Sequence, residues 1–344
     1  MLYTSTRNKK DAFTVHQAIC SRRASDGGLF IPYRLPVFSA DEICRLSGIG
    51  FNSRLAEILN LFFGSHLTGY DIDLAVGKRP VRLHQLSQRL LLAECWHNTQ
   101  WQFSELLNAL AKLICTDDYE NAEVYGWLET GVRISVFFGT VGELLLQDVI
   151  SIEKPVDIAM VSGNFSGPMA AWYAREMGLP IGNIICCCNE NAALWDFVCH
   201  GQLRTDGVSI SSLVPEADIN VPDGLERLIS QHTGAEGVQY YADCVHSGRT
   251  YYADAAFLSN LRRGIYVTVS SEPRILSTVS SSFSAHKCVM SVSSALAYAG
   301  LQDYRARTGA SRMALIMSDK SPRLDISDIA QILRRPEQEI EKYI

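Results

Sequence analysis

The sequence has no excess of basic residues, no long hydrophobic run and no regular cysteine spacing. Its 31 Lys and Arg are outnumbered by 37 Asp and Glu, for a formal net charge of −6, which argues against binding nucleic acid or anionic membranes by bulk electrostatics. No apolar run approaches the roughly 20 residues of a membrane-spanning helix. The N-terminus MLYTSTRNKKDAF is polar and lacks a signal core. The sequence therefore predicts a cytoplasmic protein with neither nucleic-acid nor membrane partners.

The ten cysteines follow no metal-binding or disulfide pattern. Most are scattered, one run reads Cys186-Cys187-Cys188, and no CxxC pair occurs. Zinc sites need several ligands at close and regular spacing, and a chain of 344 residues does not need disulfides to stabilise its core. The triplet is typical of a strand whose neighbouring side chains face opposite ways. We therefore expect buried free thiols and no metal site.

Hydrophobic periodicity and turn residues predict alternating helices and strands. Helices are expected at 39–48, 51–63, 103–115, 141–152, 168–177 and 293–308, and strands at 157–161, 184–188, 266–271 and 313–317. The serine-rich run STVSSSFS, 277–284, is expected to be a loop. The strand, helix and second strand between 157 and 188 form a βαβ unit, which predicts an α/β fold with a parallel sheet.

A glycine-containing loop joins the first strand of this unit to its helix. It reads Gly163-Asn164-Phe165-Ser166-Gly167, and Pro168 suits the first helical turn because its missing N–H would have no partner there. Backbone N–H groups at a helix start bind anions, and glycine lets the chain approach them closely. Many loops of this kind bind nothing, so on its own the pattern is only a weak indication of a phosphate site.

The segment SGNFSGPMAAWYAREMGLPIGNIICCCNEN, 162–191, closely resembles the threonine synthase segment that runs SGNFGN, helix, MGLPI, strand, NEN. Four other stretches resemble the same family in the same order: YTSTRN, ASDGGLFIP, LVPEADINVPDGLERL and ALAYAGLQDYRARTG. The resemblance implies the tryptophan-synthase-β-like architecture of fold type II pyridoxal-phosphate (PLP) enzymes. It implies a small helical N-terminal unit (1–80), a shortened lysine and substrate-loop region (81–150) without most of the family's inserted middle domain, and an α/β domain with the phosphate cradle (151–344).

The family converts O-phosphohomoserine and water to threonine and phosphate, with PLP as cofactor. By position, the resemblance implies six cofactor-binding residues: Gly163, Asn164, Phe165, Ser166 and Gly167 in the phosphate cradle, and Ser294 facing the pyridine nitrogen. The family's imine-forming lysine lies in a run resembling ELFHGPTLAFKDFG. The matching run here is ECWHNTQWQFSELL, 94–107, with Ser104 in place of the lysine. Serine cannot form the imine, so the resemblance implies a lyase of amino-acid biosynthesis that has lost its catalytic residue.

Nothing in the sequence restores the missing lysine. Lys112 lies eight residues beyond Ser104, about 12 Å along a helix, and Lys287 is expected on a loop. The family's SGDTG substrate loop is absent, and its late PHTA motif aligns with Val292-Ser293-Ser294-Ala295, without the histidine. Five polar residues are expected to be structural or solvated: His97, Asp117, Asp118, Cys199 and His200.

Two main hypotheses follow, and a third stays open. In the first, the chain is a non-catalytic homologue that binds a phosphorylated small molecule, or a partner protein, through the cradle. In the second, it is an enzyme with altered chemistry, which predicts a closed polar pocket near Gly163, Ser104 and Ser294. In the third, a sister chain of a homo-oligomer supplies the lysine. A pocket collapsed around Trp96 and Trp101 would count against the second.

Overall fold

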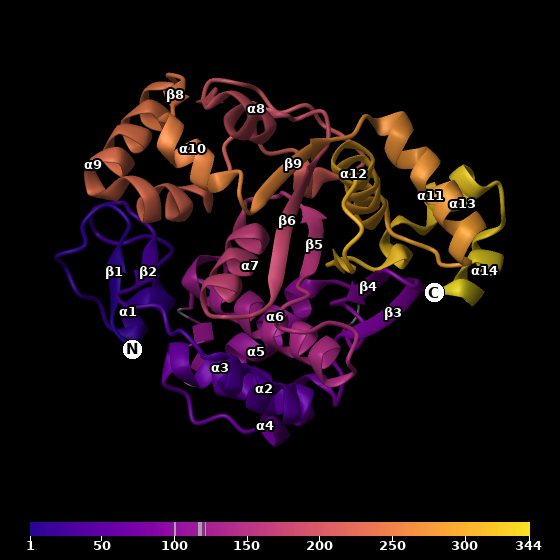
Figure 1. Ribbon diagram of the computed structural model, residues 1–344, viewed down its shortest axis with the longest axis horizontal. Helices are drawn as coiled ribbons and strands as arrows, with labels where there is room; N and C mark the ends of the chain where they lie inside the picture. The colour runs from indigo at the N-terminus through magenta and orange to yellow at the C-terminus, as the bar shows by residue number, and fades with distance from the viewer. Residues whose placement is uncertain (100, 116–118, 121) are drawn as a thin grey trace.

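The computed structural model describes residues 1–99, 101–115, 119–120 and 122–344. Its centre is a six-stranded sheet in the order β3-β4-β10-β5-β6-β9 (Figure 1). The strands, in that order, are Arg82–Ser87, Leu90–Glu94, Ala314–Ser318, Val156–Val161, Ile181–Cys188 and Ile265–Val269. Neighbours from β4 to β9 pair in parallel, and β3 is an antiparallel edge strand. The predicted α/β fold with a mostly parallel sheet is therefore confirmed.

Successive side chains of each strand enter two separate hydrophobic cores, one on each face of the sheet. Leu315 and Met317 of β10 belong to one core, and Ala314 and Ile316 belong to the other. The first core is covered by α3 (Phe51–Phe63), α5 (Phe103–Cys115), α6 (Glu129–Leu146) and α7 (Ser166–Glu176), and the second by α11 (Glu272–His286) and α12 (Val292–Thr308). Burial on both faces explains the nearly continuous apolar runs of these strands.

The cysteine triplet follows the same alternation. Cys186 and Cys188 enter the first core and Cys187 the second, as predicted for a strand. The cysteines are free thiols, and most of them are buried. Burial raises the pKa of Cys187 to about 12 and that of Cys188 to about 11, so these sulfurs stay protonated and unreactive at neutral pH.

The N-terminal part is a small, mostly helical unit, as predicted. Its elements are β1 (Tyr3–Ser5), α1 (Val15–Cys20), β2 (Phe30–Pro32), α2 (Ala40–Gly48), α3 and α4 (Gly69–Val76). Ser39 and Glu42 form a capping box at the start of α2, which accounts for the helix expected at 39–48. Glu226 at the start of α9 (Leu225–Ser247) forms ion pairs with Arg7 and Arg23, and so ties this unit to the rest of the chain.

A further group of elements lies beyond β9, beside the N-terminal unit (Figure 1). It contains α8 (Ala193–His200), β7 (Gln202–Leu203), α9 (Leu225–Ser247), β8 (Tyr251–Tyr252) and α10 (Ala255–Leu261). The C-terminal helices α13 (Ile326–Leu333) and α14 (Glu337–Ile340) lie on the opposite side, next to α11. Within the ranges described above, no helix combines the length and the apolar character needed to cross a membrane.

Two of the predicted segments were wrong. The run 277–284 is not a loop but the middle of α11, because Ile275, Val279 and Phe283 bury one helical face. Its hydroxyl groups donate to carbonyls of the preceding turn, for example Thr278 Oγ1 to the Arg274 oxygen at 2.8 Å, which lets a serine-rich run remain helical. The helix expected at 141–152 is α6, which begins at Glu129 and ends at Leu146. The boundaries at 80 and 150 remain predictions.

Candidate functional site

A pocket of about 530 Å³ opens where β4, β10 and β5 end. This is the carboxyl edge of the parallel strands, where α/β proteins bind ligands. Its lining comes from the start of α5, one face of α6, the loop before α7, the start of α12 and the residues after β10. Ser104, Gly163 and Ser294, predicted to surround one pocket, all line it. Trp96 and Trp101 do not, so the pocket has not collapsed around them.

The loop between β5 and α7 presents backbone donors to this pocket. Gly163 and Phe165 have φ of +48° and +69°, and these left-handed turns lead directly into the helix at Ser166. In the described part of the chain, the N–H groups of Gly163, Asn164 and Gly167 have no protein acceptor. Free N–H groups at a helix N-terminus form an anion site, so the loop has the geometry of a phosphate cradle.

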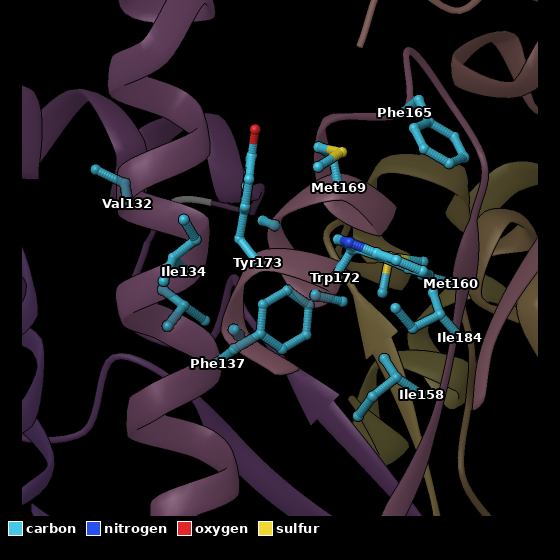
Figure 2. Packing of buried hydrophobic residues seen from close by; sticks show 14 of the residues in the cluster. Val132, Ile134, Phe137, Ile158, Met160, Phe165, Met169, Trp172, Tyr173 and Ile184 are labelled. Carbon is cyan, nitrogen blue, oxygen red and sulfur yellow. The ribbon is translucent and has the colours of Figure 1, made fainter. Parts of the chain in front are cut away.

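The side chain of Phe165 does not line the pocket. Figure 2 places Phe165 at the turn before α7, with Met169 one helical turn farther on, in the hydrophobic cluster. The side chain is 1% exposed, and the Phe165 N–H donates to the Ser162 oxygen at 3.0 Å. Phe165 therefore anchors the loop, while Gly163, Asn164, Ser166 and Gly167 face the pocket.

The loop is held in place by contacts on both sides. Within it, Asn164 Oδ1 accepts the Ser166 N–H at 3.0 Å. From outside, the N–H of Gly224, just before α9, donates to the Asn164 oxygen at 2.9 Å. A β-carbon at Gly224 would lie only 2.9 Å from that same oxygen, so the close approach requires glycine. Contacts within the protein thus hold the conformation of this loop.

A charged network lies beside the cradle. Ser166 Oγ donates to Glu129 Oε1 at 2.6 Å, and Arg133 Nε donates to the same oxygen at 2.9 Å. Arg133 Nη1 also pairs with Asp319 at 2.8 Å. Burial alone would lower the pKa of Arg133, but the charges of Asp319 and Glu129 outweigh it and raise that pKa. Arg133 is therefore a permanent cation whose charge is already shared between two carboxylates.

The amine that an imine requires is missing from its expected place. Ser104 is the second residue of α5 and lines the pocket, so the helix predicted from the family register is present without its lysine. Lys112 contacts the ring of Tyr119, and Lys287 ends α11 beside Phe283. Neither residue lines the pocket in the described part of the chain.

Lys320 is the one lysine in the described lining of the pocket. Its Nζ lies 2.8 Å from Asp325 Oδ1. Burial would lower the pKa of Lys320, but the hydrogen bond and the charge of Asp325 raise it. An amine attacks a carbonyl only in its neutral form, so this ion pair opposes imine formation at neutral pH. Lys320 was not among the lysines predicted as possible substitutes, although its place just after a predicted strand was a usable signal.

Ser294 lines the pocket, but its hydroxyl is engaged. It donates to Ser318 Oγ at 2.7 Å and lies 2.8 Å from Ser291 Oγ. Trp96 Nε1 donates to the same Ser318 oxygen at 3.0 Å. Donation from Ser294 to a pyridine nitrogen would require the hydroxyl to turn away from Ser318.

The remaining predicted residues lie elsewhere. His97 is half-buried. Burial and, to a smaller extent, the charge of Arg82 lower its pKa, so its ring is uncharged at neutral pH. Cys199 and His200 end α8, as expected. Asp117 and Asp118 fall outside the described residues. Within the described ranges, no group of three His, Cys, Asp or Glu side chains is placed to hold a metal ion.

PLP fits only one end of this pocket. The free N–H groups of the cradle suit its phosphate. For its aldehyde, the described lining offers Ser104, which cannot form an imine, and Lys320, which is held as an ammonium. The residues present therefore do not fit PLP as a covalently held cofactor, and no reaction step follows from it here.

The whole chain superimposes on PLP-bound threonine synthase from Brucella melitensis with a TM-score of 0.84, at 17% identity and over 99% of that chain. It superimposes on yeast threonine synthase with a TM-score of 0.82, at 14% identity and over 94% of that chain. These likenesses define the class of the fold: an α/β protein of PLP fold type II.

The sequence comparisons find partial matches to threonine synthases and threonine synthase-like proteins. Residues 2–78 match the model of the threonine synthase N terminus. The chain is 28% identical to human threonine synthase-like 1 over 159 residues, which are 45% of this chain and 21% of the relative. It is 28% identical to human threonine synthase-like 2 over 172 residues, which are 47% of this chain and 34% of that relative. The chain thus resembles threonine synthases in its N-terminal part and in its fold, and the matched region is about a fifth to a third of these curated relatives.

Proposed function

We propose that this chain binds a small phosphorylated molecule non-covalently in the pocket and does not carry out the imine chemistry of threonine synthases. The observation that carries the proposal is the combination of the cradle with Ser104 at the lysine position. Each hydrogen bond from a free N–H to a phosphate oxygen is charge-assisted and contributes about 1.5–3 kcal/mol. Three such donors, at Gly163, Asn164 and Gly167, support reversible binding without a covalent link.

A pocket enzyme with altered chemistry remains the alternative, and Lys320 is the residue through which it would act. The ion pair with Asp325 argues against it, because the pair keeps the amine protonated. In the proposed function, Lys320 therefore supplies a fixed positive charge in the lining of the pocket.

The test compares PLP, pyridoxal and inorganic phosphate as ligands of the purified protein, by calorimetry. Binding through the cradle predicts that PLP and inorganic phosphate bind and pyridoxal does not. PLP is then added, reduced with borohydride and the protein digested for mass spectrometry, with Lys320→Met as the matched variant. We expect no stoichiometric adduct on any lysine. An adduct on Lys320 that Lys320→Met removes would refute the proposal and make this residue the imine-forming lysine.

A further inference from the structure

One face of α6 supplies both polar and apolar lining to the pocket. Glu129, Arg133, Val136 and Phe137 are spaced at i, i+4, i+7 and i+8, and all four line it. Glu129 is 4% exposed. Its Oε1 atom accepts hydrogen bonds from Ser166 and Arg133, whereas its Oε2 atom is buried and has no hydrogen-bond partner among the described residues. Leaving a buried carboxylate oxygen without a donor costs free energy, which a bound group with a donor would recover.

This unpaired oxygen belongs to a side chain that touches the phosphate cradle. Ser166, whose hydroxyl reaches Glu129 at 2.6 Å, is the first residue of α7. The free N–H groups of Asn164 and Gly167 lie on either side of Ser166 in the chain. A phosphate ester seated on these donors therefore brings the atoms next to its phosphate close to Glu129.

The surroundings of Glu129 favour a neutral donor over a cationic one. Arg133 already donates to Oε1 of Glu129, although it shares its charge with Asp319. An ammonium group brings three N–H donors and needs three acceptors, whereas a hydroxyl satisfies its single donor on one oxygen. The next residues along this face of α6 are Val136 and Phe137, whose side chains accept no hydrogen bonds. A hydroxyl therefore fits Oε2 without leaving further polar groups unpaired.

We propose that the ligand of this pocket is a phosphate monoester of a polyol, with one free hydroxyl donating to Glu129 Oε2 while the phosphate lies on the cradle. The inference rests on the proposed function and names the substrate class of the same site. It makes Glu129 the residue that sets specificity. Ser166 is a positioning residue, because its hydroxyl donates to Oε1 and so helps to fix the orientation of the Glu129 carboxylate.

The test measures the affinity of the full chain for four probes: inorganic phosphate, glycerol 3-phosphate, propyl phosphate and phosphoethanolamine. Glycerol 3-phosphate and propyl phosphate have the same carbon chain and differ in their hydroxyls. We expect glycerol 3-phosphate to bind at least roughly tenfold more tightly than propyl phosphate, the gain of one charge-assisted hydrogen bond. Phosphoethanolamine is expected to bind no better than propyl phosphate.

Glu129→Gln tests the residue itself. It removes the charge of the acceptor, so the preference for glycerol 3-phosphate should fall to less than about threefold, while inorganic phosphate binds as well as before or better. Glu153→Gln, an exposed substitution with the same loss of charge, is the matched control and should leave all affinities unchanged. If Glu129→Gln does not fold, the comparison of probes on the unaltered chain still decides the question.

The outcomes separate this inference from the proposed function. Equal affinity for glycerol 3-phosphate and propyl phosphate would overturn the polyol inference while leaving the cradle in use. Tightest binding of phosphoethanolamine would also overturn it, in favour of an amine donor. If no probe binds, including inorganic phosphate, the proposed function itself fails.

Discussion

Gly224→Ala is the most direct test of how the cradle is built. Gly224 lies just before α9 and has φ of −65° and ψ of −15°, so alanine can adopt its backbone conformation without strain. The new β-carbon, however, would lie 2.9 Å from the Asn164 oxygen and 3.0 Å from the Phe165 carbonyl carbon. Both are backbone atoms of the cradle loop and cannot turn aside as a flexible side chain would. The substitution must therefore move the loop or α9 by a few tenths of an ångström.

Overpacking of this kind costs about 1–3 kcal/mol. We expect urea unfolding of Gly224→Ala to show a loss of stability in that range, with the slope of the transition unchanged. Because the cradle donors belong to the displaced loop, calorimetry should also show weaker binding of inorganic phosphate, by about tenfold for each 1.4 kcal/mol lost. The matched control is Gly48→Ala at the end of α2, where a β-carbon meets nothing within 4 Å. There we expect no loss of phosphate affinity.

This prediction would be refuted if Gly224→Ala kept its free energy of unfolding within about 0.5 kcal/mol of that of the unaltered chain and bound inorganic phosphate equally well. That result would mean that the cradle loop yields to its neighbour at no cost and is not held by the close approach of Gly224. A loss of stability with unchanged phosphate affinity would instead show that the donors do not move with the loop.

Ser104→Lys should allow PLP to form an adduct that borohydride fixes to residue 104, read by mass spectrometry; failure to label it would contradict the placement of Ser104 in the pocket. Arg54→Ala should lower the free energy of unfolding by about 3–5 kcal/mol in a urea titration, because it leaves Glu143 without its buried partner. Arg45→Ala, which breaks the exposed pair with Glu57, should cost less than about 1 kcal/mol in the same titration. Burial raises the pKa of Asp157 above 3.8 despite its bond from the Asn183 N–H. The folded state therefore binds the Asp157 proton more tightly than the unfolded chain does, which stabilises the fold at low pH. This stabilisation is lost as the pH rises through the folded-state pKa, and Asp157→Asn should abolish that loss in unfolding curves measured at a series of pH values.

Much of the local structure could be predicted because its causes are local. Ser39 and Glu42 cap α2 three residues apart, and Pro168 lies in the first turn of α7. The apolar runs of β5, β6 and β10 predicted buried parallel strands, and the loop from Gly163 to Gly167 predicted an anion site. The loop predicted at 277–284 was wrong because hydroxyl groups that usually favour loops here bond to their own helix, α11, whose apolar face packs against α12 and α13.

The composition of the pocket depends on contacts between residues far apart in the sequence. β10 is the last strand of the sheet in the chain, yet it lies between β4 and β5. This position brings Asp319 to Arg133, 186 residues away, and places Lys320 in the lining of the same pocket as the cradle. Strand order is set by which arrangement buries both faces of the sheet, a property of the whole chain.

The sequence by itself determined the resemblance to threonine synthases, the glycine-containing loop and the serine in place of the lysine at position 104, since each is a matter of residue type at a given position. Only the tertiary structure decided that Glu129 has one oxygen bonded to Ser166 and Arg133 and the other without a partner among the described residues. It also decided that Lys320 lines the pocket as an ammonium paired with Asp325. The physical reason is that burial and pairing of charges depend on neighbours that only folding brings within hydrogen-bond distance.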